Sequence, residues 1–219
     1  DNSSNLYTKA IDSLLNIQTK VDIEGLQDYS EDLLIDEMSL FLEWYLTKFK
    51  QFKVEDPSVL LKIFSLIAKK VHRQNKCFVH RDYHSRNLMF ILDDDPGILD
   101  YQDAVLGPIT YDLVSLLKDA YIDLDEEFIL DQSVRYWEKA KKLELIKNED
   151  FSSFYEDFEW MGVQRHLKIL GIFARLSIRD NKNQYLEDIP LVEKYLIATS
   201  ERYSCLHPLR KILDKVIIK

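Results

Sequence analysis

The sequence predicts a mainly α fold of the α+β class, in which one small β-hairpin is set into a helical body. The chain has only 5 glycines and 5 prolines among its 219 residues, under half of the average share of roughly 12 %. Apolar residues recur at helical spacing over most of the chain and change to short continuous runs near residues 77–100. We therefore expect long helices joined by few turns, in a single domain over residues 1–219.

The first 76 residues are expected to be helical. An apolar stripe over residues 6–17 predicts one amphipathic helix. Ser30, followed by two acidic residues, is typical of a helix start, because serine caps free amides and acids favour the positive end of the dipole. That helix continues through Tyr45, and Pro57 opens a third helix that extends to Val71.

Short strands are expected in the middle of the chain, followed by helices. Residues 77–80 and 88–91 form apolar runs, Asp93–Gly97 is a strong turn signal, and residues 98–100 would return beside the second run. Helices are predicted from Tyr111 onward, at about 111–120, 126–142, 149–180, 188–200 and 207–217.

The net charge of 29 − 38 = −9 disfavours a nucleic-acid partner, which would need a basic face against phosphates. No apolar run approaches the roughly 18 residues of a membrane span, and no leader peptide is recognisable. Cys77 and Cys205 offer neither metal-ligand spacing nor a disulfide framework. We therefore expect a cytoplasmic protein with no membrane partner.

Residues 80–87 read His-Arg-Asp-Tyr-His-Ser-Arg-Asn and carry the densest functional signal. Asn87 precedes the outgoing arm of the expected hairpin, and Asp100 ends the returning arm. Because the arms are of similar length, Asn87 and Asp100 should meet at the open end, beside the loop that holds Asp82. One amide oxygen and two carboxylates would converge there.

Such a set suits phosphoryl transfer, which needs hard oxygen ligands for Mg²⁺ and one carboxylate to accept the proton of the attacking hydroxyl. Asp82 is the predicted catalytic base, and Asn87 and Asp100 are the predicted metal ligands. The alternative interpretation is that all three are polar loop residues that satisfy backbone groups.

The spacing H-R-D-x-x-x-x-N, followed 13 residues later by a strand-ending Asp, resembles the catalytic loop of the protein-kinase-like fold. Asp100 is followed by Tyr-Gln-Asp rather than Phe-Gly, so the sequence resembles the aminoglycoside phosphotransferase and choline kinase family rather than eukaryotic protein kinases. Segments 80–89, 99–117 and 164–176 are most similar to bacterial cell-wall sugar kinases, which phosphorylate N-acetylmuramate and N-acetylglucosamine at the anomeric hydroxyl in peptidoglycan recycling. The resemblance implies ATP and Mg²⁺ as cofactors and an amino sugar as the small-molecule substrate.

The resemblance also implies a departure from the family pattern. The five glycines are far apart, so no glycine-rich phosphate loop is present, and no strand with a phosphate-pairing lysine precedes Asp82. We therefore expect a protein-kinase-like C-terminal lobe alone, with the N-terminal nucleotide-binding lobe absent as a missing partner and little activity in isolation.

Further residues receive weaker assignments. The resemblance implies that His80 supports the catalytic loop by hydrogen bonding. Asp103 would either support the loop or touch the metal shell or sugar. Asp112 is a recurrent family anchor, although helix capping after Thr110 and dipole stabilisation also explain it. The predicted substrate-binding residues, each with a purely structural alternative, are His84, Arg86, Arg165 and His166.

Two other functions stay open at this point. The same fold could act on an aminoglycoside, choline or another small alcohol, and an acidic lobe would favour a cationic acceptor. An anionic sugar would instead need basic contacts such as Arg86, Arg165 or Lys168. The chain could also be a non-catalytic pseudokinase or interaction domain, although the complete set of oxygen ligands argues against it.

Overall fold

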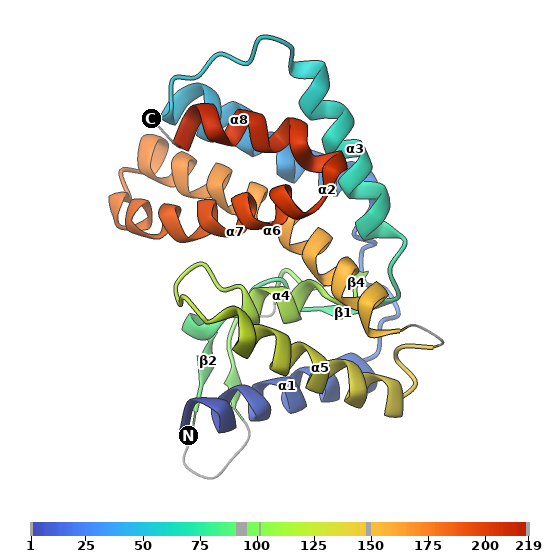
Figure 1. Cartoon of the computed structure of the whole chain (residues 1–219). Coiled ribbons are helices and arrows are strands. Elements are labelled where there is room, and N and C mark those ends of the chain that lie inside the picture. The colour runs from blue at the N-terminus through green and yellow to red at the C-terminus, as the bar shows by residue number, and fades with distance from the viewer. Residues whose placement is uncertain (1, 91–95, 101, 148–149, 218–219) are drawn as a thin grey trace. The chain divides into compact units, whose positions relative to one another are not determined.

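The structure is a computed structural model, and it describes residues 2–90, 96–100, 102–147 and 150–217. The described part is mainly helical, as predicted (Figure 1). It contains two small antiparallel sheets, whereas the sequence predicted one hairpin. The chain forms two compact units. Unit 1 comprises residues 1–29 and 73–158, and unit 2 comprises residues 30–72 and 159–219. The expectation of a single domain stays a prediction.

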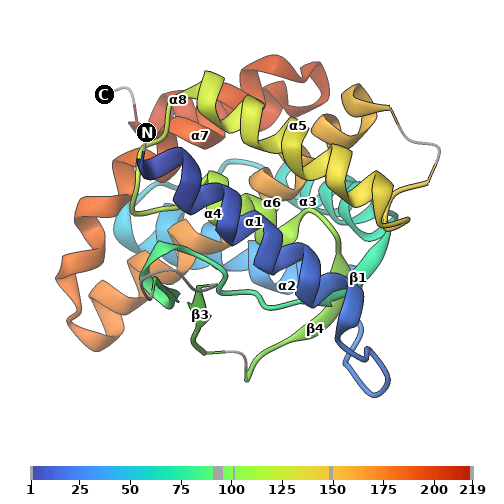
Figure 2. The same ribbon diagram turned by 90° about the horizontal axis from the view of Figure 1, so that it is seen from below.

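Unit 1 holds both sheets. Its elements are α1 (Asn2–Lys20), β1 (Lys76–Val79), the 3₁₀ turn η2 (Ser85–Asn87), β2 (Leu88–Met89), β3 (Gly97–Ile98), β4 (Val105–Pro108), α4 (Tyr111–Leu117), α5 (Glu126–Lys142) and the first turns of α6 (Phe151–Asp180). Helices α1 and α5 lie side by side in both views (Figures 1 and 2). Buried Gln18 of α1 joins them, because it accepts from the Tyr136 hydroxyl at 2.6 Å and donates to the Ile109 carbonyl at 3.2 Å.

Strand β4 was not predicted. It pairs with β1 in antiparallel register, with Val79 opposite Val105 and Lys76 opposite Pro108. A Cβ atom on Gly107 would lie 3.2 Å from the side chains of Tyr29 and Val79, so a larger residue would force these neighbours to shift by a few tenths of an ångström. Glycine and proline disfavour strands in general, which is why the sequence pattern did not indicate this one.

The predicted hairpin is present but shorter than expected. Strand β2 pairs with β3, with Leu88 opposite Ile98 and Met89 opposite Gly97. The pairing continues at its open end, where the Leu99 amide donates to the Asn87 carbonyl at 3.0 Å. The predicted turn at Asp93–Asp95 lies outside the described residues.

Unit 2 is helical in its described part. Its elements are α2 (Glu31–Leu40), the π-helix η1 (Phe41–Phe49), α3 (Pro57–His72), the remainder of α6, the 3₁₀ turn η3 (Asn183–Asp188), α7 (Ile189–Arg202), the 3₁₀ turn η4 (Ser204–Leu206) and α8 (His207–Ile217). Ser30 caps α2 as predicted, since its hydroxyl accepts from the Leu33 amide at 3.2 Å. The predicted helix through Tyr45 changes to π geometry at Phe41, a change that side-chain periodicity does not reveal.

Three buried carboxylates connect the helices of unit 2 through side chains. Glu37 faces the Lys168 ammonium at 3.1 Å and accepts from the Gln164 amide at 3.2 Å. The other two are Glu159, which bonds to Arg202 and Tyr203, and Glu193, which bonds to Tyr45 and Lys50. Within the described residues, none of the helices combines the length and apolarity that a membrane span requires.

Candidate active site

The segment from His80 to Asn87, called the catalytic loop below, leaves β1 and leads through η2 into β2. Tyr83 anchors its middle, because the buried Tyr83 hydroxyl donates to the Ala10 carbonyl of α1 at 2.7 Å. The polar residues around Tyr83 are thereby held in an irregular backbone. A loop of this kind needs partners for its amides, since an unpaired buried amide is costly.

Asp112 supplies two of those partners. Its carboxylate is completely buried and accepts from the amides of His80 at 2.6 Å and Arg81 at 3.0 Å. Arg81 has a φ of +74°, a value that non-glycine residues rarely adopt. Asp112 therefore stabilises a strained backbone directly before Asp82. The Thr110 side chain does not cap α4 and donates to the Gln74 side chain at 2.6 Å instead. Helix capping by Thr110 therefore does not explain why Asp112 follows it.

His80 is buried, and burial lowers its pKa, although the charges of Asp82 and Asp100 and a hydrogen bond to the Leu99 backbone oppose the shift. A neutral imidazole can accept at one ring nitrogen. The Asp82 amide donates to Nδ1 of His80 at 3.3 Å. His80 thus takes part in a hydrogen bond within the loop, and its role in supporting the loop stays a prediction.

Asp82 and Asn87 are joined through the loop itself. The Asn87 side-chain amide donates to the Asp82 carbonyl at 3.0 Å, and the Asn87 main-chain amide donates to the His84 carbonyl at 2.9 Å. With its nitrogen used in this way, Asn87 has its side-chain oxygen left for a ligand. The half-buried carboxylate of Asp82 makes no hydrogen bond or ion pair with any other described residue.

Asp100 follows the hairpin pairing directly. Since Leu99 bonds to Asn87, Asp100 lies one residue beyond that pair at the open end of the hairpin. It is exposed and has a φ of +66°, which aspartate tolerates better than most residues. The charges of Asp82 and Asp100 both act on His80. The three residues predicted for chemistry therefore gather around the catalytic loop.

This donor set fits magnesium. Mg²⁺ is usually bound by one or two carboxylates together with substrate phosphates, rather than by a cage of protein ligands. No group of three or more His, Cys, Asp or Glu ligands is present in the described part of the chain. The side-chain oxygens of Asn87 and Asp100 are the donors in this loop that could hold such a cation.

Arg86 and His84 share a neighbour that sequence reasoning missed. The Arg86 guanidinium lies 3.5 Å from the centre of the Tyr121 ring, and the His84 ring packs edge-on against Tyr121 at 5.4 Å. Asp119 was missed as well. Its buried carboxylate accepts from the amide and hydroxyl of Ser85 at 3.0 and 2.6 Å. Neither residue belongs to a recognisable motif, so no local signal distinguishes them.

The remaining predicted site residues are Asp103, Arg165 and His166. Asp103 is exposed and makes no hydrogen bond or ion pair within the described residues. Arg165 and His166 lie in unit 2 and are buried, with His166 stacked on Tyr195 at 5.0 Å. Their proposed contact with a substrate stays a prediction.

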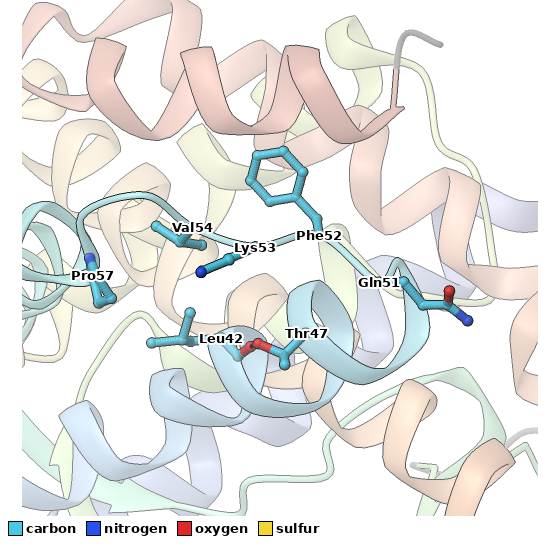
Figure 3. A pocket seen from close by; sticks show the side chains of 7 residues that line it. All are labelled: Leu42, Thr47, Gln51, Phe52, Lys53, Val54 and Pro57. Atoms are coloured by element: carbon cyan, nitrogen blue, oxygen red, sulfur yellow. Dashed lines mark hydrogen bonds between the residues drawn. The ribbon is translucent and has the colours of Figure 1, made fainter.

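A separate hollow of about 540 Å³ lies in unit 2, between η1 and the segment that follows it (Figure 3). It contains none of the predicted site residues. Its lining residues are Leu42, Thr47, Gln51, Phe52, Lys53, Val54 and Pro57.

Curated relatives match nearly the whole chain. A protein named N-acetylmuramate/N-acetylglucosamine kinase from Neisseria meningitidis serogroup B is 46 % identical over 220 positions, covering 97 % of this chain and 64 % of the relative. A protein of the same name from Pseudomonas aeruginosa is 39 % identical over 215 positions, covering 97 % and 63 %. The chain thus spans less than two thirds of the length of these two relatives.

Among solved structures, an ADP-bound aminoglycoside phosphotransferase is similar in fold, with a TM-score of 0.51 and 14 % sequence identity. The similarity covers 90 % of this chain and 66 % of that one. The model of the phosphotransferase enzyme family matches residues 1–144, a range that contains the whole catalytic loop and Asp100. The chain therefore belongs to the phosphotransferase enzyme family.

Proposed function

We propose that the chain forms the catalytic and acceptor-binding lobe of an ATP-dependent kinase, which transfers the γ-phosphate to the anomeric hydroxyl of N-acetylmuramate or N-acetylglucosamine. The observation that carries this proposal is the gathering of Asp82, Asn87 and Asp100 around one braced loop. The choice of acceptor is supported by relatives of 46 % and 39 % identity that carry this substrate in their names.

Asp82 is the proposed base. Its carboxylate is half-buried and has no hydrogen-bond partner among the described residues, so it is available to accept the proton of the attacking hydroxyl. Asp112 holds the two amides before this residue and His80 accepts from the Asp82 amide itself, which limits the movement of the carboxylate. Positioning of this kind is a large part of phosphoryl-transfer catalysis.

Asn87 and Asp100 would hold Mg²⁺. When bound, the cation neutralises charge on the nucleotide phosphates. Asn87 orients its side-chain oxygen by donating to the Asp82 carbonyl. Asp100 contributes an exposed carboxylate, which has no competing ion pair within the described residues.

The proposal is tested by incubating the full-length protein with ATP and Mg²⁺ and four acceptors: N-acetylmuramate, N-acetylglucosamine, kanamycin and choline. We expect ATP consumption with the two sugars only. The methyl glycoside of N-acetylglucosamine is the matched control, because its anomeric oxygen is blocked, and it should not be phosphorylated. ³¹P and ¹H NMR of the product would identify the phosphorylated oxygen.

Other results would replace the proposal. Turnover only with kanamycin or choline would assign a different acceptor to the same fold. Phosphorylation of the methyl glycoside would contradict anomeric specificity. If none of the acceptors were phosphorylated even at high protein concentration, the chain would more closely fit a non-catalytic interaction domain. The Asp82→Asn variant, run in parallel, reports activity from contaminating kinases.

We also propose that residues outside this chain cover the nucleotide. The five isolated glycines provide no phosphate-binding loop. The 219-residue chain by itself is therefore expected to bind ATP weakly and to transfer almost no phosphate. Isothermal titration calorimetry and a coupled assay on the chain alone and on the full-length protein would measure the difference. Comparable turnover by both would overturn this part of the proposal.

A further inference from the structure

Asp119 is a buried carboxylate that the proposed chemistry does not use. It lies two residues after the end of α4 and is 1 % exposed. One carboxylate oxygen accepts from both the amide and the hydroxyl of Ser85, at 3.0 and 2.6 Å. The other oxygen accepts from the amide of Tyr121 at 3.1 Å. Three donors on one buried carboxylate explain how it is accommodated away from water, because charge-assisted hydrogen bonds offset desolvation.

The contact with Ser85 is placed at the start of η2. The first amides of a helical turn have no partner within the turn, and His84, at the capping position, provides no side-chain bond. Asp119 satisfies the Ser85 amide from a residue 34 positions away in the sequence. The turn that begins there ends at Asn87, whose main-chain amide donates back to His84. The orientation of Asn87 therefore depends on how this turn is held.

Tyr121 links Asp119 to two side chains of the catalytic loop. Its amide is held by Asp119, and its ring contacts the Arg86 guanidinium and the His84 ring. A cation over an aromatic face is attracted by the negative face of the ring. Asp119 thus holds the backbone of the turn and also the platform on which Arg86 rests.

The short helix α4 consequently holds the catalytic loop at two places. Asp112, near its beginning, binds the amides of His80 and Arg81, which precede Asp82. Asp119, just after its end, binds Ser85, which precedes Asn87 by two residues. The two carboxylates therefore act on different parts of the site.

We propose that Asp119 is a positioning residue for Asn87, acting through Ser85 and the η2 turn, and that it thereby sets the magnesium requirement of phosphoryl transfer. The inference rests on the proposed kinase function. It assigns Asp112 to the base side of the loop and Asp119 to the metal side. Removal of either brace should disturb the reaction in a different, measurable way.

The test uses the full-length protein with the Asp119→Asn variant. Asparagine keeps the size of the side chain but presents an NH₂ group to donors that need an acceptor. We expect the apparent Mg²⁺ activation constant to rise about 10-fold, with much of the rate recovered at high Mg²⁺. The Asp112→Asn variant should lose rate without this shift. The matched control is Asp125→Asn on the exposed start of α5, which should change neither.

Hydrogen exchange measured by mass spectrometry gives a readout that does not require activity. Peptides covering residues 83–90 should exchange faster in Asp119→Asn than in wild type or Asp125→Asn. The Ser85→Ala variant removes only the hydroxyl donor and should shift the Mg²⁺ constant in the same direction by a smaller factor. If Asp119→Asn does not fold, Ser85→Ala still tests the contact between Asp119 and the loop.

The outcomes separate the two proposals. The role of Asp119 would be overturned if the Mg²⁺ activation constant were unchanged in both Asp119→Asn and Ser85→Ala. It would also be overturned if the rate fell by the same factor at every Mg²⁺ concentration. Either result would leave the kinase function intact. A wild-type protein without sugar kinase activity would overturn the proposed function instead. Faster exchange at residues 83–90 would then still show that Asp119 braces the loop, but the link to magnesium would be lost.

Discussion

Buried carboxylates are used differently in the two units of this protein. In unit 1, Asp112 and Asp119 accept main-chain amides and hold a loop that is irregular apart from the η2 turn. In unit 2, Glu37 and Glu193 pair with side chains of neighbouring helices, which already satisfy their own main chain. The first arrangement determines where loop atoms lie, and the second determines how tightly helices pack. Substitution of the two carboxylates in unit 1 should therefore affect the proposed activity, and substitution of the two in unit 2 should affect stability.

The largest effect on activity is expected for Asp82→Asn. Loss of a general base typically costs about 10²–10⁴-fold in rate. Since the base acts as the new bond forms, kcat should fall while KM for ATP changes little. Steady-state kinetics of the full-length protein with the sugar acceptor measure both constants. A kcat near that of wild type would remove Asp82 from its assigned role.

Asp100→Ala should produce a smaller loss of a different kind. The proposed metal ligand acts in the nucleotide complex as well as in the transition state, so both nucleotide affinity and kcat should fall. Raising Mg²⁺ or substituting Mn²⁺ should restore part of the rate. The exposed Asp125→Ala variant provides the control for removal of one surface charge. If the deficit of Asp100→Ala were independent of the metal concentration, the ligand assignment would be wrong.

Asp112→Asn is expected to lower kcat by roughly 10- to 100-fold, as is typical when a supporting partner of an active group is lost. The NH₂ group of asparagine would face one of the two amides of His80 and Arg81 and could not accept from it, so the backbone before Asp82 should relax from its positive φ. Thermal unfolding should show a modest loss of stability only. The same change at Asp131, an exposed residue paired with Arg135 on α5, should leave kcat unaltered.

The smallest effect on activity is expected in unit 2, for Glu37→Ala. This change removes the carboxylate that faces the buried Lys168 ammonium, and loss of one partner of a buried pair typically costs about 3–5 kcal/mol of stability. Chemical denaturation should show that loss, while kcat per folded molecule stays close to wild type. Glu43→Ala, which breaks the exposed pair with Lys48, should cost less than about 1 kcal/mol. A large fall in kcat for Glu37→Ala would break the contrast between the units.

Much of the fold was predictable because its signals are local. Helices such as α5 and α8 have the predicted bounds, since an apolar face repeats every three to four residues within the element itself. The spacing of Asp82, Asn87 and Asp100 indicated their convergence for a similar reason. A hairpin with short arms brings its ends together whatever surrounds it.

Other features depend on partners that are remote in the sequence. Strand β4 forms because Val105–Pro108 pairs with β1 and with the Gln27–Tyr29 segment. Its glycine and proline, taken locally, argue against a strand. Asp119 looked like any acidic residue at the end of a helix, and its role became visible only through Ser85, 34 residues earlier.

The sequence alone therefore determined the helical class, the family resemblance and the three chemical groups of the candidate site. Only the tertiary structure decided which buried carboxylates hold the catalytic loop, and that Arg165 and His166 are buried in unit 2 rather than belonging to unit 1. The physical reason is that helix periodicity and hairpin closure depend on neighbouring residues, whereas a buried carboxylate is stabilised by whichever donors the folded chain brings to it.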